Sequence, residues 1–130
     1  MCGIIGYTGK KNAVSVIMEG LKRLEYRGYD SAGIAFFSDK GIEVRRCTGK
    51  IKDLYNLIEK EKPSSHIAIG HTRWATHGRP SEDNAHPHRS DGIVIVHNGI
   101  IENYLPLKKR LIDEGYKFTS ETDTEVICHL

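Results

Sequence analysis

The sequence predicts an α+β fold in which layered sheets are flanked by helices. Apolar residues recur at helical spacing from Val14 to Leu24. Two β-rich runs, 32–37 and 42–47, are joined by the turn Asp39-Lys40-Gly41, a pattern typical of a hairpin. Helical and strand patterns alternate again along the rest of the chain. This order of hairpins and helices fits sheets that bury their apolar faces against helices.

The expected elements follow from local signals. Strands are expected over 4–8, 32–37, 42–47, 67–70, 93–97 and 116–119, and helices over 14–24, 52–61, from Asn103 to Gly115, and from Thr122 onward. Asn12 is a suitable N-cap for the first helix, Gly28 a suitable stop, and Pro63 ends the second. Consecutive β-branched residues predict that strand 93–97 is buried on both faces. The run Thr122-Asp123-Thr124-Glu125 has the form of a capping box.

One segment breaks this periodicity. Residues 71–92 are polar and rich in Gly, Pro, Asn and His. About twenty residues without a repeating apolar pattern are unusual inside a compact domain, and such segments are more often functional than idle. Candidate site residues are therefore expected here.

Composition excludes several classes of protein. The 130 residues suit one domain or part of one, and a net charge of +2 gives no argument for a nucleic-acid partner. The basic clusters at 10–11, 45–46 and 108–110 are expected to be solvated faces. Three dispersed cysteines argue against a disulfide framework, and Cys47 and Cys128 have the apolar surroundings of core residues. No signal peptide or membrane-spanning run is recognisable, so we expect a cytoplasmic protein and no membrane partner.

Cys2 is the most informative single residue. If Met1 is removed, Cys2 becomes the N-terminus and carries a thiol and a free α-amine. The amine has a reference pKa of about 7.7–8.0, so it is a base poised near neutral pH beside its own nucleophile. Any chain can have cysteine at position two by chance. Other segments must therefore decide whether Cys2 is a catalytic N-terminal residue.

Four segments carry a family resemblance. They are Cys2-Gly3-Ile4-Ile5-Gly6, the run from Leu24 to Gly33 that contains Tyr26-Arg27-Gly28-Tyr29-Asp30, the run from Gly70 to Gly78 with Asn84-Ala85-His86-Pro87-His88, and the run from His97 to Asn103 with Ser120 to Glu125 beyond it. Together they resemble the N-terminal glutaminase domain of the glutamine–fructose-6-phosphate aminotransferases, over the full 130 residues. The resemblance implies an N-terminal-nucleophile hydrolase fold, a four-layer αββα sandwich, here incomplete.

The resemblance also implies roles for individual residues. Cys2 would be the nucleophile that attacks the side-chain amide of glutamine, and Asn98 with the Gly99 N–H would form the oxyanion hole. The substrate-binding residues would be Arg73 at the α-carboxylate, Asp123 at the α-ammonium, and Trp74, Thr76 and His77, which shape and close the pocket. Gly3 and Gly6 would allow close approach of substrate and neighbouring strands.

Purely structural interpretations remain open for several of these residues. Asn98-Gly99 is also a common tight-turn dipeptide, and Asp123 is also suited to the positive end of a helix dipole. The segment around Arg27 lies near the active site in the family, yet Arg27-Gly28 alone would suit a helix C-terminus. The five histidines between His71 and His97 lack carboxylates or thiolates at regular spacing, so no metal or other cofactor is expected.

The resemblance favours one activity over its rivals. Amidophosphoribosyltransferase, asparagine synthetase and glutamate synthase also have an N-terminal cysteine. The amino-acid sequences of segments 26–33 and 73–78 nevertheless favour the sugar-phosphate enzyme. A catalytically silent regulatory domain is a further alternative, although Cys2, Asn98 and Asp123 are intact. We expect residues 1–130 to be the N-terminal part of a class II glutamine amidotransferase domain within a homo-oligomeric parent chain, whose sugar-isomerase domains would use the ammonia to convert fructose 6-phosphate to glucosamine 6-phosphate.

Overall fold

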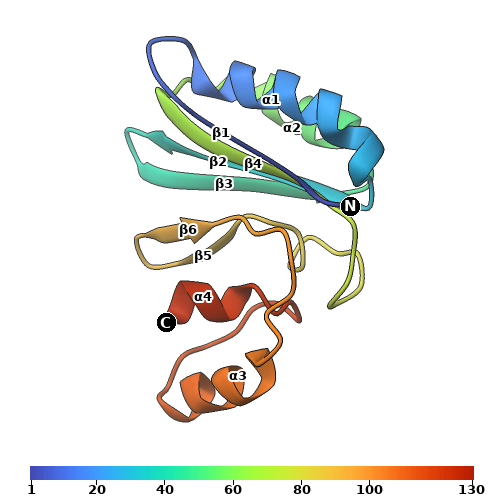
Figure 1. Ribbon diagram of the computed structural model, residues 1–130. Coiled ribbons are helices and arrows are strands. Elements are labelled where there is room, and N and C mark those ends of the chain that lie inside the picture. The colour runs from blue at the N-terminus through green and yellow to red at the C-terminus, as the bar shows by residue number, and fades with distance from the viewer.

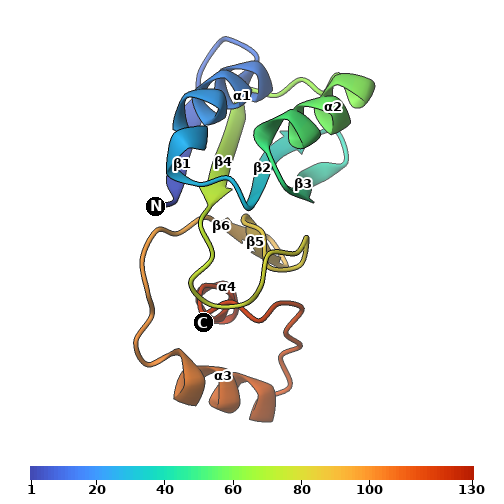
Figure 2. The same ribbon diagram turned by 90° about the vertical axis from the view of Figure 1, so that its right-hand side faces the viewer.

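Two antiparallel sheets lie between two helical layers in the computed structural model, which describes residues 1–130 (Figures 1 and 2). The elements are β1 (Gly3–Thr8), α1 (Ala13–Leu24), the 3₁₀ turn η1 (Glu25–Arg27), β2 (Ser31–Ser38), β3 (Gly41–Thr48), α2 (Ile51–Glu61), β4 (Ile67–Arg73), β5 (His88–Ser90), β6 (Ile93–Ile95), α3 (Tyr104–Asp113) and α4 (Glu125–His129). Helices α1 and α2 cover the outer face of the larger sheet, and α4 packs on β5 and β6. The expected α+β fold with its αββα layering is confirmed.

The order of the larger sheet brings distant segments together. Its strands run β1-β4-β2-β3 and every neighbouring pair is antiparallel. Strand β4 therefore lies between β1 and β2, with His71 opposite both Ile4 and Gly33. The C-terminal end of β4 consequently meets the start of β1 and the start of β2, which places residues 1–3, 28–31 and 72–75 at one end of the sheet.

The main hydrophobic core lies between this sheet and the two helices that cover it. Ile17 and Leu21 of α1 and Leu54 of α2 are completely buried there, together with Ile34 and Phe36 of β2. Burial of each large apolar side chain contributes about 1.5–3 kcal/mol. This core anchors the strands on which the candidate site residues are carried.

Asn12 is the N-cap of α1, as predicted. Its side-chain oxygen accepts hydrogen bonds from the N–H of Val14 at 3.1 Å and of Ser65 at 3.3 Å, and its amide donates to the Pro63 carbonyl at 3.2 Å. One side chain thus caps the helix and ties the loop before β4 to it.

The second sheet departs from the prediction. Strand β6 covers only Ile93–Ile95, and Ile93 is 53% exposed, so the prediction of a longer strand buried on both faces is wrong. The sheet has two strands, β5 and β6, and no further strand lies beside β6. Residues 116–119 form no strand either, because they pass along α3 and α4 without a strand partner.

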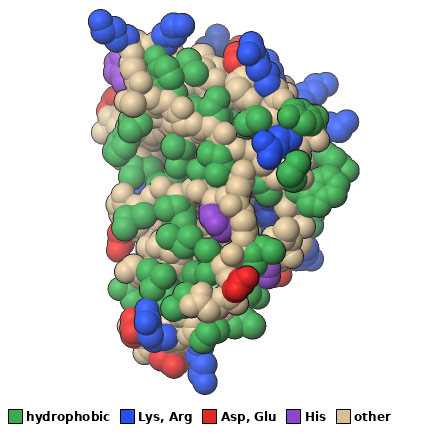
Figure 3. All heavy atoms as spheres, in the orientation of Figure 1, with side chains coloured by type: hydrophobic (Ala, Val, Ile, Leu, Met, Phe, Trp, Pro, Cys, Tyr) green, Lys and Arg blue, Asp and Glu red, His purple; other side chains and the backbone are tan.

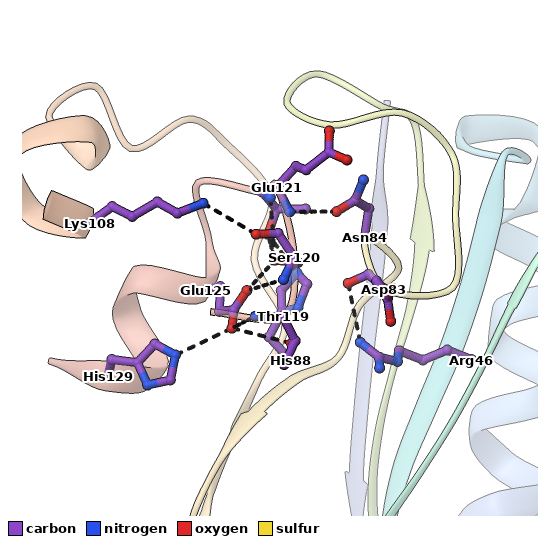
Figure 4. Close-up of polar contacts among 11 residues, drawn as sticks. Arg46, Asp83, Asn84, His88, Lys108, Thr119, Ser120, Glu121, Glu125 and His129 are labelled. Atoms are coloured by element: carbon purple, nitrogen blue, oxygen red, sulfur yellow. Dashed lines mark hydrogen bonds and ion pairs between the residues drawn. The ribbon is translucent and has the colours of Figure 1, made fainter. Parts of the chain in front are cut away.

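The capping box predicted at Thr122 does not form. Helix α4 begins at Glu125, and its N-cap residue, Thr124, makes no side-chain cap. The Glu125 carboxylate instead accepts hydrogen bonds from the N–H of Thr119 at 2.8 Å and of Ser120 at 2.7 Å, and from the Ser120 hydroxyl (Figure 4). Burial opposes the charge of Glu125, but these hydrogen bonds outweigh it and keep the carboxyl pKa below its usual value.

The remaining sequence expectations concern surface charge, cysteines and membrane segments. Lysines and arginines are scattered around the margins of the face seen in Figure 3, without a single basic patch. Arg45 and Arg46 are not simply solvated: Arg45 pairs with Glu43 and Glu61, and Arg46 donates to backbone carbonyls of the 83–85 segment. Burial raises the thiol pKa of Cys47 and of Cys128 to about 11, which leaves both unreactive. None of the helices is long and apolar enough to cross a membrane.

Candidate active site

Cys2 lies at the start of β1, against the end of β4. Its Sγ accepts a hydrogen bond from the N–H of Trp74 at 3.2 Å and lies 3.4 Å from the Trp74 carbonyl oxygen. The approach depends on Gly3, where a Cβ would lie 2.8 Å from Thr72 Oγ1 and 2.9 Å from Leu24 Cβ. The close approach expected at Gly6 is absent, because a Cβ there would make only an ordinary contact at 3.7 Å.

A cavity of about 460 Å³ opens beside Cys2. It is lined by all eight residues that the sequence analysis selected: Cys2, Arg73, Trp74, Thr76, His77, Asn98, Gly99 and Asp123. They come from the start of β1, the end of β4 with the loop after it, the loop after β6, and the loop before α4. Four segments that are far apart in sequence therefore contribute to one concave site.

Asn98 contacts Cys2 directly, and Gly99 lines the same cavity. The Asn98 side-chain amide donates from Nδ2 to the Cys2 carbonyl oxygen at 3.0 Å, while Oδ1 lies 3.0 Å from Nε2 of His71. Gly99 has φ of 140°, in the region that favours glycine. Both residues line the cavity, and an amide side chain beside a glycine N–H is the kind of neutral donor set that can stabilise an oxyanion.

Arg73 is buried, and its guanidinium holds the loop that follows β4. It donates to the carbonyl oxygens of His77 at 2.5 Å, Gly78 at 2.8 Å and Arg79 at 3.3 Å. Burial lowers the guanidinium pKa, and the negative charge of Asp30 partly offsets that effect. Arg73 therefore supplies a buried positive charge to the cavity wall while it fixes the loop backbone.

Asp123 supplies the opposite charge. Only 3% of its surface is exposed, and its Oδ2 accepts a hydrogen bond from the N–H of Ile101 at 2.6 Å. Because α4 begins two residues later, the carboxylate lies ahead of the helix and ties the 98–101 loop to the loop before α4. A buried cation and a buried anion thus line the same cavity, an arrangement that suits a zwitterionic ligand.

The aromatic residues of the 74–77 loop form the rim. Trp74 is 47% exposed and packs edge-on against Tyr29, with ring centroids 5.2 Å apart. His77 packs edge-on against Tyr104 at 5.1 Å. Thr76 lies between these contacts in the sequence and also lines the cavity. The loop is therefore supported from two sides by aromatic contacts.

Several residues at or beside the site were not selected from the sequence, among them Asp30 and His86. The Asp30 carboxylate accepts a hydrogen bond from the N–H of Ala75, and the Asp30 N–H donates to the Arg73 carbonyl oxygen at 3.2 Å. His86 stacks on His71 and lines the cavity. Arg27, whose role was left open, lines the cavity too. All three residues lie in the segments that carry the family resemblance, and this was the only sequence signal for them. Their contacts across the sheet cannot be deduced from residue spacing.

The buried histidines beside the cavity are neutral. Burial lowers the pKa of His71 to about 4 and that of His88 to about 4, and it lowers the pKa of His86 further. No group of three or more His, Cys, Asp or Glu side chains is arranged to hold a metal ion.

Comparison with known proteins agrees with this geometry. A family model described as a glutamine amidotransferase domain matches residues 58–130. Proteins named glutamine–fructose-6-phosphate aminotransferase [isomerizing] match the whole chain: the one from Caldanaerobacter subterraneus subsp. tengcongensis is 59% identical over 132 residues, and the one from Methanosarcina acetivorans is 61% identical over 134. The chain spans only 22% and 21% of their lengths.

Solved structures show the same arrangement of elements. The glutamine phosphoribosylpyrophosphate amidotransferase from B. subtilis superposes with a TM-score of 0.83 at 30% identity, over 100% of this chain and 29% of that one. A structure titled as the allosteric regulatory enzyme of purine biosynthesis gives 0.84 at 31% identity, with the same coverage.

Proposed function

Because this chain belongs to the glutamine amidotransferase domain family, we propose that it releases ammonia from the side-chain amide of glutamine through a thioester on Cys2. The observation that carries the proposal is the single cavity in which the Cys2 thiol, the Asn98 amide and buried charges of both signs meet. The other two cysteines have raised pKa values and do not line this cavity.

The first half of the reaction forms the thioester. Removal of Met1 frees the α-amine of Cys2, which takes the thiol proton as the sulfur attacks the amide carbon. The oxygen of the tetrahedral intermediate carries the negative charge, and the Asn98 Nδ2–H and Gly99 N–H stabilise it. The C–N bond then breaks, the proton passes from the amine to the leaving nitrogen, and ammonia departs.

The second half returns the free enzyme. A water molecule gives a proton to the same α-amine and attacks the thioester carbon. The same two donors stabilise the second oxyanion. Collapse of this intermediate breaks the C–S bond and releases glutamate, while the amine returns the proton to the sulfur. No separate histidine is needed as a base, and burial lowers the pKa of His71 and His86, which makes both weak bases.

The charged ends of glutamine account for Arg73 and Asp123. The Arg73 guanidinium is the only buried cation among the lining residues and suits the α-carboxylate, whereas Asp123 suits the α-ammonium. Trp74, Thr76 and His77 then shape the entrance. Both charged side chains also hold loop backbone, so binding of the substrate and order of the loops are coupled at this site.

The acceptor of the ammonia is proposed from the relatives. The relatives are 59–61% identical to this chain over its whole length, which favours fructose 6-phosphate as the acceptor and glucosamine 6-phosphate as the product. The conversion would be carried out by sugar-isomerase domains of a longer parent chain. Phosphoribosylpyrophosphate is the second candidate, supported by the B. subtilis amidotransferase structure at 30% identity. A reactive thiol needs a reducing compartment, so we place the protein in the cytoplasm.

The decisive experiment measures glutamate release by the full-length protein. We expect a mature N-terminus at Cys2 by intact mass, and labelling of Cys2 alone by an electrophilic glutamine analogue. Cys2→Ala should abolish glutamine hydrolysis, whereas Cys47→Ala should preserve it. Active protein that retains Met1, or label on Cys47 or Cys128, would contradict the mechanism.

A further inference from the structure

His71 is a buried histidine that the reaction above does not use. It lies on β4, which has a partner strand on each side, and it is opposite Ile4 of β1 and Gly33 of β2. No part of it is exposed, and its ring stacks on that of His86 with centroids 4.1 Å apart and planes at 12°. Because both neighbouring strands hold the backbone, the side chain is presented from a rigid position.

The hydrogen-bond partners of His71 determine its tautomer. Its Nε2 lies 3.1 Å from the His97 carbonyl oxygen and 3.0 Å from Oδ1 of Asn98, and both are acceptors. Its Nδ1 is buried without a partner. The ring therefore carries its proton on Nε2 and is neutral, which agrees with the lowered pKa.

The same donor determines how the Asn98 amide is turned. With Oδ1 facing Nε2–H of His71, Nδ2 faces Cys2 and donates to its carbonyl oxygen at 3.0 Å. A turn of the amide by 180° would place its NH₂ against the His71 N–H and its oxygen toward the cavity. An oxygen in that position would repel an oxyanion rather than stabilise it.

His86 supports the same loop from the other side. Its Nδ1 accepts a hydrogen bond from the N–H of His97 at 3.3 Å, while His71 bonds the carbonyl oxygen of the same residue. The stacked pair thus occupies both backbone polar groups of the residue that precedes Asn98. A shift of this end of the loop would therefore break a buried hydrogen bond to His71 or His86.

We propose that His71 is a positioning residue whose Nε2–H orients the Asn98 amide toward the reacting carbonyl oxygen. The inference rests on the proposed role of Asn98 in glutamine hydrolysis. It distinguishes His71 from an ordinary packed core histidine, because its effect on the reaction must pass through Asn98.

The test compares three single variants of the full-length protein by their kcat and KM for glutamine hydrolysis. His71→Asn places its amide near the position of Nδ1 and loses the donor, so kcat should fall about 10- to 100-fold with KM changed less than about threefold. His71→Gln places an amide donor near the position of Nε2 and should recover most of the rate. His66→Asn changes an exposed histidine on the loop before β4 and should match the wild type.

A double-mutant cycle separates positioning from packing. If His71 acts through Asn98, then His71→Asn should lower kcat no further in an Asn98→Ala background. Multiplicative losses would overturn the proposal, as would equal losses in His71→Asn and His71→Gln when both melt like the wild type, or an unchanged kcat in His71→Asn. Absence of glutamine hydrolysis in the wild type would refute the proposed function, and the role proposed for His71 would then be refuted as well.

Discussion

Gly33→Ala is a direct perturbation of the contact that brings the 84–88 segment against the larger sheet. A Cβ built on Gly33 would lie 2.0 Å from the His86 carbonyl oxygen and 3.0 Å from Arg46 Cγ. Real Cβ atoms essentially never approach closer than 3.0 Å, so the His86 backbone must retreat by at least 1 Å (3.0 − 2.0). Overpacking of this kind typically costs about 1–3 kcal/mol of the free energy of unfolding.

The displacement should reach the active site. His86 stacks on His71 and accepts the hydrogen bond from the His97 N–H, so a 1 Å shift loosens the support of the Asn98 loop. Misplacement by about 1 Å in a catalytic site can cost about 10²-fold in rate. We therefore expect Gly33→Ala to lower kcat for glutamine hydrolysis by about 10- to 100-fold.

The assay pairs thermal unfolding with glutaminase kinetics of the full-length protein. Each kcal/mol lost corresponds to about 2–4 °C in the midpoint for a domain of 150–250 residues. Gly92→Ala is the matched control, since no atom lies within 4 Å of its added Cβ and its φ is not positive. If Gly33→Ala kept the midpoint and kcat of Gly92→Ala, the argument from this close contact would be refuted.

Three further predictions follow from the site. Asn98→Ala removes an oxyanion donor and should lower kcat about 10²–10³-fold with a modest change in KM, and an unchanged kcat would return Asn98-Gly99 to the role of a turn. Asp123→Asn should impair use of glutamine but leave synthesis from added ammonia largely intact in the full-length protein; equal loss with both nitrogen sources would indicate misfolding. Acid should destabilise the fold between about pH 6.5 and pH 4, because His71 and His88 are neutral when folded but bind protons when unfolded. In this window each histidine should lower the free energy of unfolding by up to about 1.4 kcal/mol per pH unit. A urea midpoint that does not change over this range would contradict buried neutral histidines.

Most of the α+β architecture could be predicted from local sequence. Periodic apolar residues identified α1, Pro63 marked the end of the helix predicted at α2, the turn at 39–41 identified the β2–β3 hairpin, and Asn12 caps α1 as expected. These signals work because each depends on residues close together in the chain. The strand predicted at 116–119 failed for the complementary reason: strand formation requires a partner strand, and none lies beside these residues.

A different set of hydrogen bonds replaced one predicted local feature near the site. Thr122 to Glu125 has the spacing of a capping box, yet Glu125 satisfies the backbone N–H groups of Thr119 and Ser120 (Figure 4). A buried carboxylate gains more from several donors in a turn than from a single cap at a short helix. These hydrogen bonds to Glu125 hold the loop that carries Asp123. Residue spacing alone does not predict this arrangement.

The sequence by itself determined which residue types were available for chemistry: a cysteine at position two, the Asn98-Gly99 dipeptide, and the charged residues Arg73 and Asp123. Only the tertiary structure decided that these residues share one cavity and that His71 bonds the Asn98 amide. The physical reason is that β4 lies between β1 and β2, so its end meets segments about 70 and 40 residues earlier in the chain, while the Asn98 amide joins the loop after β6 to Cys2. Such pairings depend on the packing of whole sheets, and no local pattern of residues encodes them.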